Sequence, residues 1–225
     1  MVAAHPDDEV LGCGGLMARF RKEGHAVFTL ILGEGIVSRK PGDGKNRLEI
    51  EALKKAALRA NRILGVKKVF FRSFPDNKFD TAPMLDIVRA VEEIKKEIKP
   101  EIIFTHFARD LNIDHRCAYQ AVITAARPLS GEGVREIYSF EVLSSTEWAY
   151  PLSFSPDVFF EISRTVDIKL KALKEYKNEL RRPHHPRSVE AVKLNARLWG
   201  IKTGLEYAEA FKNVRSIRKI GFKKR

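Results

Sequence analysis

Short apolar runs rich in β-branched residues alternate along the chain with longer segments whose apolar residues recur at helical spacing. This alternation is typical of repeated β-α-β units, in which helices cover a parallel sheet. The runs expected to form strands are residues 2–4, 26–32, 66–71, 101–105, 137–142 and 158–162. The helices are expected at residues 16–22, 48–64, 84–99, from about 114, 167–180 and 188–199. The pattern therefore predicts an α/β fold, and the helix at 188–199 is expected to complete it.

Two histidines follow expected strands, and acidic residues lie near each of them in the sequence. His5 opens the run His-Pro-Asp-Asp-Glu directly after the first strand, and His115 follows the fourth strand. If the strand order is 3-2-1-4-5, strands one and four are neighbours whose following loops diverge, and ligands bind in the crevice between them. Residues about 110 positions apart in the sequence are therefore expected to form one site.

The residue types in these two segments suit a catalytic metal. His5, Asp8 and His115 provide two imidazoles and a carboxylate, a set that binds zinc and leaves one position open for water. Asp7 is then the candidate general base, because zinc lowers the pKa of a bound water to about 7 and a nearby carboxylate can take its proton. Other divalent ions also occupy sites of this kind, so the ion itself stays open.

Each half of this site also has an ordinary structural interpretation. A Pro-Asp-Asp run is commonly a turn, and a single loop histidine is commonly a surface or core residue. Asp114 is expected either to cap the helix that begins beside it or to hold the His115 imidazole from behind, and capping is favoured. His25 and His106, which open and close expected strands, are interpreted as structural.

A glycine-rich stretch follows the first histidine, at residues 12–15. It is expected to form a turn before the helix at 16–22. A dinucleotide fingerprint would place a third glycine where this chain has Met17. The sequence therefore excludes a Rossmann cofactor site.

Three segments together resemble the LmbE-like, or PIG-L, deacetylases: AHPDDEVLGCGG at 4–15, THFARDLNIDHR at 105–116 and YAEAF at 207–211. The resemblance spans nearly the whole chain. It implies a Rossmann-like three-layer sandwich with a mainly parallel central sheet, and zinc-dependent removal of the N-acetyl group from a GlcNAc-type sugar. It also assigns His5, Asp8 and His115 to zinc and Asp7 to the general base, in agreement with the chemical argument.

The chain departs from the family pattern at Asn112, where some members carry a histidine that binds substrate or stabilises the oxyanion. Asn112 is a candidate substrate contact, because an amide can donate a hydrogen bond there, but it carries no positive charge. His185 is the candidate for this second catalytic role, because its His-Pro-Arg-Ser segment resembles a late segment of relatives of the diacetylchitobiose deacetylase type. The alternative is that His184 and His185 form a prolyl loop without a catalytic part. In some of those relatives the late histidine comes from a neighbouring subunit, which makes a homo-oligomer one expectation for this chain.

Two further residues are candidates for contacts with sugar hydroxyl groups. Arg39 follows the second expected strand and Asp76 follows the third, so both lie at the same edge of the sheet as the histidines. The alternatives are that Arg39 is a solvated cation and that Asp76 is a turn residue.

Length and composition limit the classes of protein to which the chain could belong. The 225 residues, 44% of them hydrophobic, fit one domain over residues 1–225 with a basic tail at 215–225. There is no apolar stretch of about 18 residues and no signal-peptide pattern, so a cytoplasmic protein without a membrane span is expected. Cys13 and Cys117 are expected to be buried thiols. The single glutamine and the Lys- and Glu-rich surface are typical of thermophile proteins.

A net charge of +12 raises the alternative of a nucleic-acid-binding protein. The basic residues are spread along amphipathic helices and the tail, without the interleaved aromatic residues of a nucleic-acid groove, so this alternative is the less favoured. A second alternative keeps the zinc chemistry but changes the bond that is cleaved, to another N-acyl substrate such as a thiol or antibiotic precursor. The sequence does not separate this alternative from the sugar deacetylase.

Overall fold

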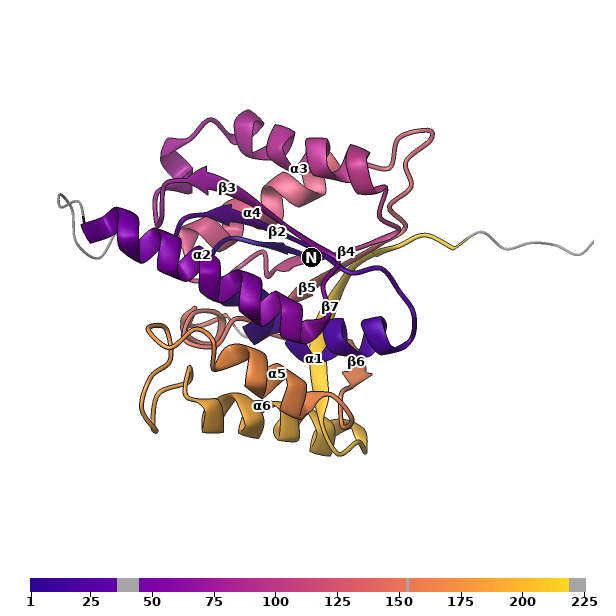
Figure 1. Ribbon diagram of the computed structural model, residues 1–225. Coiled ribbons are helices and arrows are strands. Elements are labelled where there is room, and N and C mark those ends of the chain that lie inside the picture. Colours follow the sequence, from indigo (N-terminus) through magenta and orange to yellow (C-terminus); the bar gives the residue numbers. More distant parts are fainter. Residues whose placement is uncertain (36–44, 153, 219–225) are drawn as a thin grey trace, which may run out of the picture.

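The computed structural model describes residues 1–35, 45–152 and 154–218 of the chain (Figure 1). Its strands are β1 (Val2–Ala3), β2 (Phe28–Gly33), β3 (Lys68–Phe74), β4 (Ile102–His106), β5 (Glu136–Phe140), β6 (Val158–Glu161) and β7 (Ala208–Ser216). Its α-helices are α1 (Asp8–Lys22), α2 (Lys45–Leu64), α3 (Met84–Ile98), α4 (Ile113–Ala125), α5 (Val166–Leu173) and α6 (Val189–Thr203). Two short 3₁₀ turns, η1 (Phe79–Thr81) and η2 (Thr146–Trp148), follow β3 and β5.

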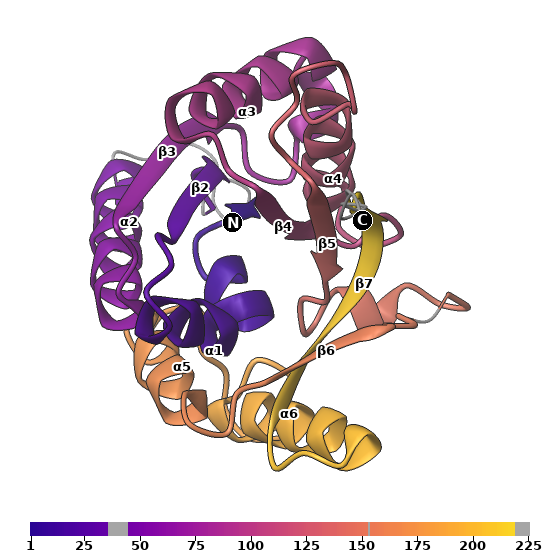
Figure 2. The ribbon, with the colours of Figure 1, turned by 90° about the vertical axis from the view of Figure 1, so that its right-hand side faces the viewer.

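The strands form two hydrogen-bonded groups that meet in the middle of the sheet. Strands β1, β2 and β3 pair in parallel, and β4 pairs in parallel with β5. The second group continues from β5 to β7 and then β6 through antiparallel pairs. Strand β1, at the N-terminus, lies beside β4 (Figure 2). The Ala4 N–H, just after β1, donates to His106 Nε2 at 2.8 Å. The expected order 3-2-1-4-5 is therefore confirmed, and the sheet is mainly parallel.

Alternate residues of the central strands face two different helical layers. Ala3 and Ile31 pack on the side of α1, α2 and α5, whereas Leu30 and Leu32 pack on the side of α3 and α4. Both faces of the inner strands are thus buried, as in other parallel sheets. The result is the expected three-layer sandwich, with the helical layers above and below the sheet in Figure 1.

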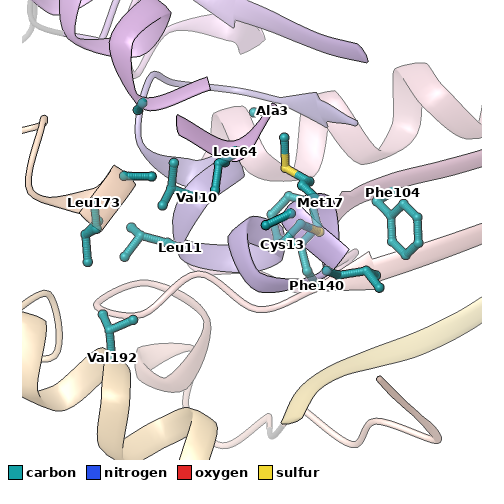
Figure 3. Packing of buried hydrophobic residues seen from close by; sticks show 14 of the residues in the cluster. Ala3, Val10, Leu11, Cys13, Met17, Leu64, Phe104, Phe140, Leu173 and Val192 are labelled. Atoms are coloured by element: carbon teal, nitrogen blue, oxygen red, sulfur yellow. The ribbon is translucent and has the colours of Figure 1, made fainter. Parts of the chain in front are cut away.

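The glycine-rich stretch is helical, so the expected turn at residues 12–15 is wrong. Helix α1 runs without interruption from Asp8 to Lys22, and its buried side packs against the sheet (Figure 3). A Cβ atom on Gly12 would lie 2.1 Å from the Phe140 ring, and one on Gly15 would lie 2.7 Å from Ile162. These glycines allow α1 to approach its neighbours closely, and this packing outweighs their poor helix propensity.

The helix expected at 188–199 is not the last element of the fold, because strand β7 follows it. This strand lies between β5 and β6, with Ala208, Ala210 and Phe211 buried. Arg215, assigned to a basic tail from the sequence, belongs to β7, and its guanidinium donates to the backbone carbonyls of Ala126 and Val134. Polar residues at 212, 213 and 215 interrupt the apolar pattern of β7, which explains why the sequence pattern missed it.

Two helices differ in detail from the expected pattern. The buried face of α2 is formed by Leu53, Ala56, Ala57, Ala60 and Leu64, whereas Leu48 is 75% exposed. Helix α5 ends at Leu173 and not near residue 180. None of the helices within the described ranges combines the length and the apolar character needed to cross a bilayer.

Candidate metal centre

The three predicted metal ligands come together at the carboxyl ends of β1 and β4. His5 follows β1, Asp8 is the first residue of α1, and His115 lies in the first turn of α4. Asp8 Oδ2 is 3.4 Å from His5 Nδ1 and 3.4 Å from His115 Nε2. One potential ligand atom from each residue lies within 4.8 Å of the other two, and all three residues are buried. The geometry expected from the strand order is thus realised.

Buried polar atoms at this point fit a divalent metal ion. Asp8 Oδ1 and His115 Nε2 are inaccessible to solvent and have no hydrogen-bond partner within the described part of the chain. Leaving a carboxylate oxygen and an imidazole nitrogen unpartnered is costly, since both lose their interactions with water. A metal ion would satisfy both atoms, and two imidazoles with one carboxylate form a ligand set that zinc favours.

Two carboxylates orient the histidines from behind. Asp114 Oδ2 lies 2.8 Å from His5 Nε2, and Asp110 Oδ1 lies 3.1 Å from His115 Nδ1. Each ring therefore turns its other nitrogen toward Asp8. This is the arrangement found around metal-binding histidines, in which the outer carboxylate fixes the ring and makes its free nitrogen a better ligand.

These contacts correct the role expected for Asp114. The side chain that caps α4 is Asn112, whose Oδ1 accepts from the Asp114 N–H at 2.8 Å. The Asp114 carboxylate instead faces His5 and accepts from the backbone N–H groups of Asn77 and Phe79. The expectation of capping is wrong because Asn112 stands two positions earlier, at the N-cap, where its side chain reaches the free amides.

Asp7 has a backbone conformation that non-glycine residues rarely adopt, with φ of 104°. Its N–H donates to Glu9 Oε2 at 3.0 Å, and its carbonyl accepts from Val10 and Leu11. Glu9 is itself buried and accepts hydrogen bonds from the Asn61 amide and the Tyr176 hydroxyl. Strained residues of this kind occur at functional sites, where the surrounding bonds hold them in place.

The Asp7 carboxylate faces Arg187, whose Nη1 donates to Asp7 Oδ2 at 3.2 Å. The pKa of the Asp7 carboxyl is raised to about 8, chiefly by burial, with Arg187 lowering it and the nearby Asp8 and Glu179 raising it further. A dication at the neighbouring ligands would add a further attraction for the ionised form. Arg187 is held on its other side by a hydrogen bond from Nε to the Leu143 carbonyl.

A polar pocket opens in front of Asp7. It is lined by His5, Pro6, Asp7, Gly35, Asp76, Asn77, Asn112, Glu179 and Arg187. Asp76 and Asn112, both predicted to contact substrate, are thus brought beside Asp7, and Asp76 Oδ1 lies 3.3 Å from His5 Nε2. Arg39, the third residue of that prediction, lies outside the described residues.

The structure places His185 apart from this pocket within the single chain. Its Nδ1 accepts from the Arg187 N–H at 3.0 Å, and its ring packs edge-on against Trp148. It lines a separate groove with residues of α6, including Leu194 and Leu198. A catalytic role for His185 therefore stays a prediction.

Several site residues were not found from the sequence. Asp110 lies within the segment THFARDLNIDHR, but its contact with His115 was not predicted. Arg187 is two positions from His185, and no sequence pattern indicates which of them reaches Asp7. Glu179 lies in a polar stretch without any motif. These residues act through tertiary contacts that only the fold defines.

Comparisons with known proteins are consistent with this site. The sequence profile described as PIG-L, GlcNAc-PI de-N-acetylase, matches residues 1–126. An uncharacterised deacetylase of Escherichia coli is 29% identical over 189 residues, 79% of this chain and 89% of that protein. The diacetylchitobiose deacetylase of Thermococcus kodakarensis is 26% identical over 226 residues, 96% of this chain and 82% of that protein.

A solved structure supports the same fold. A conserved protein of Thermus thermophilus matches with a TM-score of 0.76 at 26% identity, covering 100% of this chain and 98% of that one. The matched family segment, residues 1–126, contains both halves of the metal centre, from His5 to His115.

Proposed function

We propose, because the chain belongs to the PIG-L (GlcNAc-PI de-N-acetylase) family, that it hydrolyses the N-acetyl group of a GlcNAc-containing sugar or glycoconjugate. The proposed reaction uses one zinc ion. Membership makes the chain a deacetylase, which is an amide hydrolase. It also favours an enzyme over the alternative of a non-catalytic nucleic-acid-binding protein. The observation that carries the zinc proposal is the convergence of His5, Asp8 and His115 around unpartnered buried atoms.

The protein's part in the proposed reaction begins with holding the metal. His5 Nδ1, His115 Nε2 and an Asp8 carboxylate oxygen would be the ligands, and Asp110 and Asp114 would fix the two rings. A zinc ion bound there supplies a Lewis acid that acidifies water and polarises the amide carbonyl.

Asp7 is the proposed general base. Its carboxylate lines the pocket next to His5 and is not needed as a ligand, since Asp8 already lies between the two histidines. It would take a proton from the attacking water and return one to the amide nitrogen as the carbon–nitrogen bond breaks. Arg187 would hold the carboxylate in the orientation for both transfers through its hydrogen bond to Oδ2.

The pocket also offers groups for a polyhydroxylated substrate. Asp76 and Glu179 provide carboxylate oxygens, and the Asn112 amide donates one of its two N–H groups to Asn77. The second N–H is proposed to donate to substrate. Hydroxyl groups of a sugar are both donors and acceptors and suit such a lining. Asp76 and Asn112 are therefore proposed as substrate contacts, and Arg39 is proposed with them on its position in the sequence. His185 is retained as a proposed participant that a neighbouring subunit could supply.

Acetate release from defined substrates tests this proposal. N-acetylglucosamine, diacetylchitobiose and an N-acetylated thiol conjugate would be incubated with the zinc-loaded enzyme, and acetate and free amine would be quantified. We expect equal amounts of both products from a GlcNAc-containing substrate, loss of turnover with a chelator and recovery with zinc. Turnover of the thiol conjugate alone would favour the alternative N-acyl substrate, and no turnover of any GlcNAc substrate with zinc bound would overturn the sugar assignment.

A further inference from the structure

One buried histidine contacts both halves of the metal centre without being a proposed ligand. His106, the last residue of β4, is fully buried. Its Nε2 accepts the N–H of Ala4, the residue before His5, at 2.8 Å. Its ring stacks on the His115 ring, with the centroids 4.0 Å apart and the planes inclined by 21°. This side chain therefore touches the backbone beside one proposed ligand and the ring of another.

The contact with Ala4 stands where the two strand groups meet. Within the described residues β1 pairs with β2 and β4 pairs with β5, and β1 and β4 share no ladder of backbone bonds. In a regular ladder the Ala4 N–H would meet a backbone carbonyl of the neighbouring strand. The imidazole takes the place of that carbonyl, and a buried N–H left without an acceptor is costly.

This bond also defines what His106 is able to do. Because Nε2 accepts a hydrogen bond from the Ala4 N–H, its lone pair is already used and the ring proton lies on Nδ1. His106 Nε2 lies 3.6 Å from Asp8 Oδ2, close to the centre, yet it is committed to the backbone. The side chain can therefore set the positions of ligands without itself being one.

We propose that His106 is a positioning residue that fixes the separation of His5 and His115, and with it the affinity of the site for its metal. The bond to Ala4 would fix the backbone that leads into His5, and the stacked ring would support His115. The inference rests on the proposed function in taking His5, Asp8 and His115 as the ligands.

Three substitutions separate the two contacts. His106→Phe keeps a ring against His115 but has no acceptor for the Ala4 N–H. His106→Gln loses the stacked ring but offers an amide oxygen near the position of Nε2, whereas the shorter His106→Asn does not reach that position. We expect the zinc dissociation constant to rise about 10- to 100-fold in the Phe and Asn variants, as for the loss of other outer partners of metal ligands. The Gln variant is expected to recover most of the affinity.

The measurement is zinc affinity by competition with a chromophoric chelator, together with the visible spectrum of the cobalt-substituted protein. A changed spectrum in His106→Phe that returns in His106→Gln would show that ligand geometry follows the acceptor. Val91→Ala, in α3 within the other core, is the control for general destabilisation. It is expected to lower the unfolding temperature of the metal-free protein while keeping wild-type zinc affinity.

Three results would decide against the proposal or its premise. Wild-type zinc affinity and cobalt spectrum in His106→Phe would overturn it, and if that variant does not fold, the same result in His106→Asn would do so. Equal weakening in the folded Gln and Phe variants would overturn the acceptor role. Failure of the wild-type chain to bind zinc at all would instead remove the proposed metal centre on which the inference rests.

Discussion

At the scale of single residues, the site depends on Asp7, a strained residue that is held both at its backbone N–H and at its carboxylate. Asp7 has a φ of 104°, a conformation that costs about 1–3 kcal/mol for residues other than glycine. Glu9 binds its N–H and Arg187 binds its carboxylate. The backbone conformation of Asp7 thus directs one carboxylate into the pocket while the next residue, Asp8, faces the two histidines.

Asp7→Asn separates the proposed base from the ligands. The amide keeps the size of the side chain but cannot take a proton, so turnover is expected to fall at least about 100-fold while zinc affinity changes little. Turnover would be measured as acetate release at saturating substrate, with zinc content determined on the same sample. Near wild-type turnover in this variant would remove Asp7 as the base.

Arg187→Met tests the orientation of that base. The variant removes the guanidinium that donates to Asp7 Oδ2, from a side chain that is only 18% exposed. We expect kcat to fall about 10-fold or more with a smaller change in KM, because the proton-transfer geometry is lost and the metal ligands are not touched. Arg182→Met, at an exposed position of the same loop, is the matched control. Equal effects of the two substitutions would contradict a specific role for Arg187.

The sequence could indicate the functional residues that lie within short, recognisable motifs. His5, Asp8 and His115 follow strand ends within recognisable segments, and the structure brings them together. Arg187 was not found, because its partner is 180 positions away and the histidine two residues earlier has the more familiar acid–base chemistry. Residue type and spacing identify a ligand set, whereas the partners behind it depend on packing.

At the scale of elements, α1 is positioned by contacts along its whole length. Besides its close-packed glycines, it is joined to β7 through Glu209, which accepts from the N–H groups of Gly15 and Leu16. Lys169 pairs with Glu209 and donates to the Leu11 carbonyl. This buried network fixes the helix whose first residue is the proposed ligand Asp8, and it gives the YAEAF segment a structural role.

Gly12→Ala tests the close approach of α1 to the sheet. The added Cβ would lie 2.1 Å from Phe140, so the helix or the ring must move. Overpacking of this kind costs about 1–3 kcal/mol, and we expect a lower free energy of unfolding by denaturant titration. Gly133→Ala is the control, since its nearest neighbour would be 3.9 Å away. A stability equal to that of the wild type in Gly12→Ala would contradict the packing described here.

Element order was easier to predict than element boundaries or the last strand. The neighbourhood of β1 and β4 was expected for a doubly wound sheet with the strand order 3-2-1-4-5. The glycines at 12–15 were assigned to a turn because intrinsic propensity disfavours them in helices, and close tertiary packing reverses that preference. Strand β7 was missed because its sequence mixes buried apolar residues with half-buried basic ones.

At the scale of the whole molecule, the proposed metal would join the two strand groups. His5 and Asp8 follow β1 in one group, and His115 follows β4 in the other. Because no backbone ladder connects β1 and β4 in the described residues, ligands contributed by both groups would add a direct connection between them.

Metal removal is therefore expected to lower the unfolding temperature of the whole chain. Binding to the folded state alone adds about 2.7 kcal/mol of stability when free zinc is about 100 times its dissociation constant. Calorimetry with and without chelator would measure the shift, and Asp8→Ala should show none. A chelator effect of equal size in Asp8→Ala would place the stabilising ion elsewhere.

The most direct test of the proposed zinc deacetylase is metal content and acetate release measured on one preparation, for the wild type, Asp8→Ala and His115→Ala. We predict one zinc ion per chain and acetate release in the wild type, with both lost in the two variants. Acetate release by metal-free protein, or full zinc content in both variants, would contradict the account.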